Sequence, residues 1–221
     1  MTRRTLLIGS LLALTLGACA ADPTPTRTVA CPTAAPTSTE AQSILQDAVV
    51  ATVTVSGAAQ GEMVIELNPD AAPIATANFV SLARCGYYDN VTFHRVIAGF
   101  VIQAGDPATR ENRGDFAELG RGGPGYGFAI EPPPEGLRYD PYVVAMANNG
   151  QTNGGQFFID LVDLDDALRS VGVYTIFGEV TSGTEVVDAI ATVPVNDPRM
   201  GLPLTPVIID SIRISAEAPE G

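Results

Sequence analysis

Residues 93–107 read FHRVIAGFVIQAGDP, in which two short apolar runs are separated by Ala98 and Gly99. Apolar residues that alternate over runs of this length predict β-strands, here at 92–97 and 100–103. On the first strand, alternation places His94 on the face of Val96, opposite Phe93, Arg95 and Ile97. This stretch therefore predicts two consecutive strands of a mainly β fold.

A second stretch, residues 146–159, reads MANNGQTNGGQFFI and ends in another predicted strand, 156–159. The two stretches place one guanidinium, three amides and two aromatic rings in and beside strands: Arg95, Phe100, Gln103, Asn148, Gln156 and Phe158. Each ring alone would be ordinary barrel core, but their coincidence with Arg95 and Gln103 favours a site. The expected surface is a shallow apolar floor ringed by neutral amides, which suits a peptide and has no obvious nucleophile.

The period-two pattern continues from about Asp47 to Ser215, in runs bounded by Gly, Pro, Asn or Asp. Eight such strands suit a closed antiparallel barrel. Residues 74–84, which follow Pro73, and residues 184–191 have helical spacing and predict two helices. Seven Gly and six Pro with little periodicity make 106–142 a long loop. The other strands are predicted at 49–55, 63–67, 143–147, 175–180 and 207–214.

Composition excludes several classes of function. A chain of 221 residues that is 46% apolar and 17% charged predicts a packed core. The net charge is −13 and all 12 basic residues are Arg, so we expect no nucleic-acid partner. Three Cys and the single His94 cannot supply a structural zinc site, and they allow at most one internal disulfide. We expect neither a metal nor another cofactor.

The first 18 residues predict an export signal, since two Arg precede an apolar stretch of about half the ~20 residues that a membrane-spanning helix requires. Residues 16–19, LGAC, resemble the lipobox of bacterial lipoproteins, which implies lipidation of Cys19. The alternative is ordinary signal cleavage at the Ala-x-Ala motif of residues 18–20, which releases a soluble secreted or periplasmic protein. The adjacent Arg3 and Arg4 faintly resemble a twin-arginine signal, and the choice between that route and the Sec route stays open.

The expected domain order follows from this signal. A signal peptide occupies 1–18, and the lipidated Cys with a flexible Pro- and Thr-rich tether occupies 19–46. The barrel occupies 47–215, and 216–221 form a short tail. We expect a membrane lipoprotein that faces outside the cytoplasm.

Other reactive residues have ordinary structural interpretations. His94 is expected to be packed and hydrogen-bonded rather than a general base. Asp163, Asp165 and Asp166 lack the Gly and the distal Glu of a calcium loop, so a solvated turn is expected. Cys85 is expected to be a small buried residue at a helix end, while Cys31 could pair with another chain or stay free. Residues 131–135, EPPPE, are expected to be a stiff connector without chemistry.

The stretches at 93–107 and 146–159, in this order and separation, closely resemble the signature segments of the cyclophilin family of peptidyl-prolyl isomerases. The resemblance extends to GEMVIEL at 61–67, ANF at 77–79, GRGG at 120–123 and IFGEV at 176–180, and it covers 49–214. It implies an eight-stranded closed barrel with a helix at each end, in agreement with the element count above.

The resemblance implies a role for each matching residue. Arg95 stands at the family's catalytic Arg, with Phe100 and Gln103 beside it. The proline pocket would contain Phe100, Val101 and Phe158, while the residues that hold the substrate backbone would be Gln103, Ala147, Asn148 and Gln156. Gly120 and Gly122 would lie in a Gly-rich loop that borders the site. Two positions depart: Tyr174 stands where many members have His, and Leu164 or Leu168 replaces the pocket Trp, which implies weak cyclosporin binding.

The expected activity is rotation about X-Pro bonds, whose barrier is about 18–20 kcal/mol. As the amide twists, its nitrogen regains a lone pair that Arg95 can meet with a hydrogen bond present only in the transition state. Substrates would be Pro-containing segments of exported proteins, and we expect a monomer. The alternative is a membrane-tethered peptide-binding chaperone or adaptor with weak isomerase activity.

Overall fold

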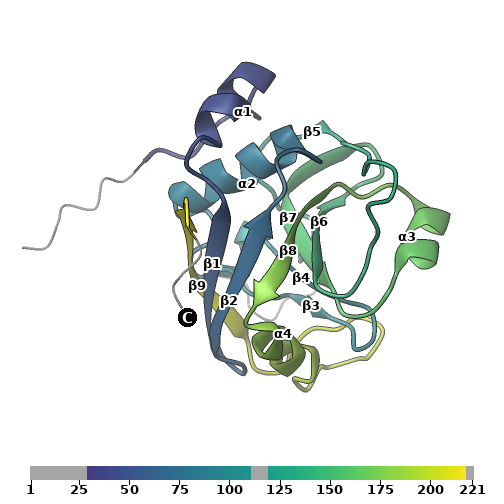
Figure 1. Cartoon of the computed structure of the whole chain (residues 1–221). Helices are drawn as coiled ribbons and strands as arrows, with labels where there is room; N and C mark the ends of the chain where they lie inside the picture. Colours follow the sequence, from purple (N-terminus) through teal and green to yellow (C-terminus); the bar gives the residue numbers. More distant parts are fainter. Residues whose placement is uncertain (1–28, 111–118, 218–221) are drawn as a thin grey trace, which may run out of the picture.

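The computed structural model describes residues 29–110 and 119–217, in which nine strands belong to one curled antiparallel sheet (Figure 1). Eight of them follow the order β3-β4-β7-β6-β8-β2-β1-β9, and β5 pairs with β7. The strands are β1 (Val50–Gly57), β2 (Gly61–Leu67), β3 (Arg95–Val96), β4 (Val101–Ala104), β5 (Phe128–Ala129), β6 (Val143–Asn148), β7 (Thr152–Asp160), β8 (Ile176–Ser182) and β9 (Val207–Ser215).

The sheet is an open half-barrel, so the prediction of a closed barrel is wrong. Its two end strands, β3 and β9, do not pair along their length. They meet near an isolated bridge between Thr92 and Ile208, next to the bond from the Phe93 N–H to the Val207 carbonyl. Because β3 contains only two residues, it cannot form a continuous ladder with β9.

The strand predicted at 92–97 is shorter in the structure, where β3 contains only Arg95 and Val96. Phe93 and Val96 both lie in the main core, which strict alternation would forbid. The alternating pattern therefore begins only at Arg95, where β3 starts.

Alternation along the other strands divides the apolar residues between the two faces of the sheet. Phe157 and Ile102 lie in the large core inside the curl, whereas their neighbours Phe158 and Val101 lie in a second cluster on the outer face. We call this second set the outer cluster. It consists of Val101, Tyr139, Val143, Ala145, Phe158, Leu164, Leu168 and Ile176.

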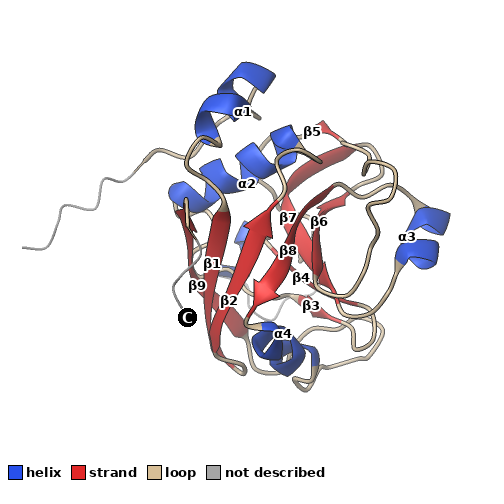
Figure 2. Cartoon of the chain, in the orientation of Figure 1, coloured by secondary structure: helices blue, strands red, loops and turns tan. Residues whose placement is uncertain are grey.

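Both predicted helices are confirmed, at α2 (Pro73–Arg84) and α4 (Thr184–Ala191). They lie at opposite ends of the curled sheet, while α3 (Asp165–Val171) stands off to one side (Figure 2). The long loop predicted at 106–142 also contains a 3-10 turn, η1 (Pro107–Arg110), and β5. No helix within the two described ranges has both the length and the apolar character needed to cross a bilayer.

The expected flexible tether is wrong for its described part, residues 29–46. Helix α1 (Ser38–Ile44) begins at a capping box formed by Thr37 and Glu40, and Ala41 is buried. A disulfide joins Cys31 to Cys85 at the end of α2, so neither thiol is free. The signal peptide and Cys19 lie outside the described residues.

The acidic segment predicted as a solvated turn is instead an ion-pair cluster at the start of α3. Asp165 is buried and binds both Arg138, at 3.3 Å, and Arg169, at 3.0 Å. Asp163 binds Arg138 at 2.8 Å. These pairs fix α3 to the 137–140 segment, and thereby place Leu164 and Leu168 in the outer cluster.

Residues 131–135 are more than a connector. The Glu131 carboxylate accepts hydrogen bonds from the backbone N–H groups of Ile74, at 3.0 Å, and Ala75, at 2.8 Å. Helix α2 has no side-chain cap of its own, so Glu131 supplies one from the distant loop and complements the helix dipole.

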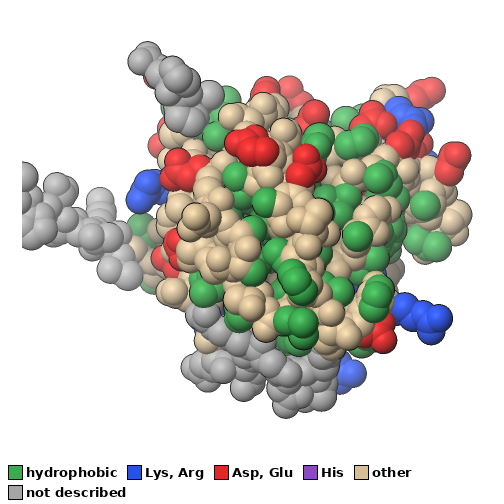
Figure 3. All heavy atoms as spheres, turned by 90° about the horizontal axis from the view of Figure 1, so that it is seen from below, with side chains coloured by type: hydrophobic (Ala, Val, Ile, Leu, Met, Phe, Trp, Pro, Cys, Tyr) green, Lys and Arg blue, Asp and Glu red, His purple; other side chains and the backbone are tan. Residues whose placement is uncertain are grey.

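Seen from below, hydrophobic side chains gather across the middle of the molecule, and acidic side chains lie toward the upper edge of that view (Figure 3). The acidic groups outnumber the basic ones, 25 to 12.

Two buried ionisable side chains have no hydrogen-bond partner of normal geometry in the described part of the chain. His94 is packed, as expected, but neither of its ring nitrogens has such a partner, and burial lowers the pKa of His94 to about 4. Both carboxylate oxygens of Asp160 also lack a partner. Burial, reinforced by Asp140, raises the pKa of Asp160 to about 8.

Asp160 should make stability fall as the pH rises. The unfolded chain loses this proton near the ordinary pKa of 3.8, whereas the folded chain holds it up to about 8. The stabilisation by Asp160 is therefore complete below about pH 4 and is lost as the pH rises to about 8. His94 has the opposite effect, since its lowered pKa makes stability rise with pH up to its ordinary pKa of 6.5. Denaturant unfolding between about pH 6.5 and pH 8 should show the decline. Asp160→Asn should flatten it, and an unchanged slope in this variant would contradict the assignment.

The disulfide should hold residues 31–46 against the sheet domain. A seven-residue helix such as α1 is marginal alone, so reduction should expose this segment to protease. The double variant Cys31→Ser/Cys85→Ser should lower the free energy of unfolding by about 2–4 kcal/mol. Limited proteolysis with and without reductant, followed by mass spectrometry, tests this. Equal cleavage within 31–46 under both conditions would show that packing alone holds the segment.

Candidate active site

The site is built on one row of side chains across three neighbouring strands. Arg95 of β3 lies opposite Gln103 of β4, and Gln103 lies opposite Phe158 of β7. Directly paired residues in antiparallel strands point to the same face of a sheet. Because Phe158 belongs to the outer cluster, the guanidinium, the amide and the ring all rise from the outer face.

A small hollow of about 150 Å³ opens beside this row. Its buried floor comes from Val101, Phe158 and Leu168, and its half-buried rim comes from both polar and apolar side chains. The rim residues are Arg95, Phe100, Gln103, Ala147, Asn148 and Tyr174. We call this hollow the apolar pocket. The structure thus brings nine of the residues predicted from the sequence together around one space.

Arg95 enters this pocket without a countercharge. Its guanidinium carbon lies 5.5 Å from the centre of the Phe100 ring, a cation–π distance. No carboxylate in the described ranges forms an ion pair with Arg95. Burial lowers the pKa of the guanidinium, but an Arg side chain stays charged at neutral pH. The pocket therefore offers an unneutralised donor at the edge of an apolar floor.

The two positions where the chain departs from the family both lie on the pocket. The sequence left open whether Leu164 or Leu168 takes the place of the Trp. Leu168 lines the pocket, whereas Leu164, the N-cap of α3, is buried in the outer cluster and does not line it. The Tyr174 ring packs edge-on against Phe158, with centroids 5.4 Å apart. The hydroxyl of Tyr139 fixes this loop, because it accepts from the Tyr174 N–H and donates to the Tyr174 carbonyl.

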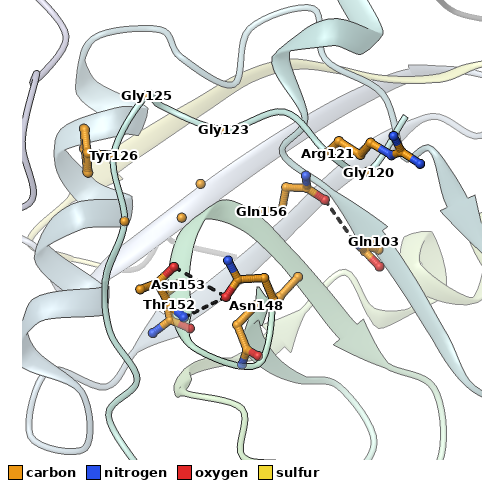
Figure 4. A pocket seen from close by; sticks show the side chains of 15 residues that line it. Gln103, Gly120, Arg121, Gly123, Gly125, Tyr126, Asn148, Thr152, Asn153 and Gln156 are labelled. Atoms are coloured by element: carbon orange, nitrogen blue, oxygen red, sulfur yellow. Dashed lines mark hydrogen bonds between the residues drawn. The ribbon is translucent and has the colours of Figure 1, made fainter. Parts of the chain in front are cut away.

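A chain of amides connects the pocket to the Gly-rich loop (Figure 4). Gln103 Nε2 donates to Gln156 Oε1 at 2.9 Å, and Gln156 Nε2 donates to the Gly122 carbonyl at 2.7 Å. Gln103 keeps its amide oxygen and a second N–H for a ligand. Gln156 therefore orients Gln103 as well as bordering the site.

The sequence analysis missed Asp106, the buried residue that holds this loop. Its carboxylate accepts from the N–H groups of Gly120, at 2.6 Å, Gly122, at 3.1 Å, and Ala108, at 2.8 Å. A Cβ at Gly122 would collide with this carboxylate, so only Gly fits there. An acidic residue at the end of a strand, ahead of a Gly-rich loop, was the available signal.

A second, larger hollow of about 560 Å³ adjoins the apolar pocket and shares Gln103, Ala147 and Asn148 with it. Gly120, Arg121, Tyr126 and Gln156 line it, together with the turn between β6 and β7 (Figure 4). The Asn148 side chain already bonds the Val173 carbonyl and the Gly150 N–H. The Asn148 side chain therefore keeps one amide N–H and one acceptor lone pair, in addition to its backbone, for a ligand.

The site contains no arrangement for covalent catalysis. His94 is buried, neutral and absent from the walls of both hollows. In the described part of the chain, no group of three or more His, Cys, Asp or Glu side chains is placed to hold a metal ion. What the geometry can do is bind an apolar ring, hydrogen-bond neighbouring peptide groups and present a positive charge.

Comparison with known proteins shows which family this chain resembles. Residues 50–214 match the family described as "Cyclophilin type peptidyl-prolyl cis-trans isomerase/CLD". The chain is 43% identical to peptidyl-prolyl cis-trans isomerase B of Streptomyces anulatus, over 69% of this chain and 90% of the relative. It is 41% identical to peptidyl-prolyl cis-trans isomerase A of Mycobacterium tuberculosis, over 71% of this chain and 88% of the relative.

Solved structures of cyclophilin type isomerases also resemble this chain. A cyclophilin type peptidyl-prolyl cis-trans isomerase from Cryptosporidium parvum superposes with a TM-score of 0.65 at 32% identity, covering 78% of this chain and 99% of the other. The crystal structure of the same protein in the presence of the dipeptide Ala-Pro superposes with a TM-score of 0.64, covering 76% and 99%. The chain belongs to the cyclophilin family and is a peptidyl-prolyl cis-trans isomerase of the cyclophilin type.

Proposed function

We propose that this isomerase is exported, is anchored to the outer side of the cell membrane by Cys19, and accelerates X-Pro rotation in other exported proteins. The observation that carries the catalytic part is the Arg95 guanidinium at the rim of an apolar pocket, where no carboxylate of the described residues pairs with it. The observation that carries the export part is the Cys31–Cys85 disulfide.

Catalysis requires only that one side of the amide turn while the other is held. The apolar pocket would take the proline ring, and its volume suits one ring rather than a larger ligand. Gln103, oriented by Gln156, and the backbone at Asn148 would hold the neighbouring peptide groups. This arrangement removes the freedom that would otherwise let the whole segment turn together.

Arg95 would supply the interaction that is specific to the transition state. In the planar amide, the nitrogen lone pair is delocalised and accepts no hydrogen bond. At the twisted geometry the lone pair returns, and a guanidinium donor can meet it. Since no carboxylate competes for Arg95 within the described residues, its donors need no rearrangement first.

Arg95→Ala should lower kcat/KM for a Pro-containing test peptide about 10²-fold or more, while the fold is kept, because Arg95 is half-buried at a rim. Arg95→Lys should recover only part of the rate, since an ammonium lacks the planar fork. The measurement is peptide isomerisation alongside thermal unfolding.

Arg213→Ala, at an exposed Arg on β9, is the matched control and should retain the wild-type rate. A wild-type rate in Arg95→Ala would refute the role given to Arg95. Suppression of the aggregation of a Pro-free client, without peptide isomerisation by the wild type, would instead favour the binding-chaperone alternative.

The disulfide supports the proposed location. Disulfides persist in oxidising compartments outside the cytoplasm and are rare within it. Cys31 and Cys85 are 54 residues apart in sequence, so their pairing closes a long loop that contains α1, β1, β2 and α2. The export signal in the sequence supports the same location independently.

Lipidation of Cys19 would give stable anchoring, because it adds at least two acyl chains at ~0.8 kcal/mol per buried CH₂. Wild-type protein should therefore sediment with membranes. Cys19→Ser should shift it to the soluble exported fraction or leave it as an unprocessed precursor, with isomerase activity retained. Cell fractionation and N-terminal mass spectrometry provide the test. A soluble, unlipidated wild-type chain that starts at Ala21 would show that ordinary signal cleavage occurs.

A further inference from the structure

A third hollow, of about 800 Å³, continues the apolar pocket on the side of the loop that follows α3. It shares Asn148 and Tyr174 with that pocket. One wall is Val171–Gly172–Val173, and Ile130 and Pro132 belong to the segment that follows β5. We call this hollow the valine groove.

The valine groove exposes apolar side chains that nothing in the fold requires at the surface. Val171, the last residue of α3, is 72% exposed, and Val173, two residues further on, is 45% exposed. No charged side chain lines the groove, in a protein whose net charge is −13. Contiguous exposed apolar surface of this kind marks a binding site.

The loop that carries the two valines is held in place. The Gly172 N–H bonds the Leu168 carbonyl at 3.0 Å, and the Asn148 side chain donates to the Val173 carbonyl at 2.9 Å. Tyr139 fixes the next residue, Tyr174, through both of its backbone groups. The exposed valines therefore form a preorganised surface, which costs little entropy to bind.

We infer that the valine groove binds apolar side chains that flank the proline in the same substrate segment, so that the enzyme prefers X-Pro bonds in apolar sequence. This inference rests on the proposed function, since it takes the apolar pocket as the proline site. The apolar pocket and the valine groove are continuous, because Asn148 and Tyr174 border both. A peptide whose proline lies in the pocket must therefore place its neighbouring residues in an adjoining hollow. The hollow that contains Arg121 is polar, whereas the valine groove offers uncharged walls.

The inference extends the role of the segment after β7. Helix α3 supplies Leu168 to the pocket, ends at Val171 and leads into Val173. A change in this one segment would thus alter both the pocket rim and the sequence preference. Exported chains that are still unfolded expose apolar sequence around proline, which fits this preference.

The experiment uses three peptides with one Ala-Pro core. The first has Leu at the two positions before the core, the second has Leu at the two positions after it, and the third has Ser at all of these positions. We expect the wild type to show a kcat/KM at least about fivefold higher and a Kd correspondingly lower for one Leu peptide than for the Ser peptide. Val171→Ser/Val173→Ser should abolish this advantage.

Two variants serve as controls. Val171→Leu/Val173→Leu keeps the walls apolar and should keep the advantage. Val49→Ser changes a valine that is 47% exposed at the start of the sheet, away from all three hollows, and should also keep it. Thermal unfolding checks that each variant is folded.

The outcomes separate the two proposals. Equal kcat/KM and Kd for all three peptides in the wild type, or an advantage that survives Val171→Ser/Val173→Ser, would overturn the valine groove. A wild type that turns over none of the peptides would contradict the proposed mechanism, and the Kd values would still decide whether the valine groove binds apolar flanks.

Discussion

The pairing of β4 with β3 on one side and with β7 on the other determines where every group of the site lies. This register puts Arg95, Gln103 and Phe158 in one row on the outer face. A shift of one residue would turn each of them to the opposite face and bring Ile102 and Phe157 outward. Apolar residues on both faces resist such a shift, because the inner core and the outer cluster would be exposed together. The geometry of the candidate site is therefore stabilised by the same burial that stabilises the fold.

Two buried carboxylates near this row, Asp106 and Asp160, differ in their hydrogen bonding. Asp106 is surrounded by backbone N–H groups of the Gly-rich loop and so holds that loop against the amide chain from Gln103. Asp160 lies opposite Val101 of the pocket floor, two residues beyond Phe158 on β7, and has no hydrogen-bond donor in the described ranges. Burial without a donor favours its neutral form, so the charge near the pocket comes from Arg95 and not from an acid beside it.

Much of this arrangement could be predicted from the sequence, because it depends on short-range patterns. Alternation located the strands that carry Arg95, Gln103 and Phe158, and Pro73 located the start of α2. The remainder depends on contacts between distant residues, which periodicity does not report. The Cys31–Cys85 bond, the cap that Glu131 gives to α2 and the ion pairs of Asp165 are all of this kind. The closed barrel failed for a local reason, since β3 is too short to pair with β9.

Because the reaction breaks no covalent bond, selectivity among substrates depends on how the enzyme binds them. The chemistry is the same for every X-Pro bond, and one guanidinium beside one small pocket cannot distinguish among them. Discrimination must then come from the surfaces on either side, where this chain has a polar hollow with Arg121 and an uncharged groove with Val171 and Val173. Most residues that line the polar hollow and the valine groove lie in segments that connect the strands, and not in the row of Arg95, Gln103 and Phe158. Such loops can change without disturbing Arg95, so substrate preference can vary while the catalytic row stays fixed.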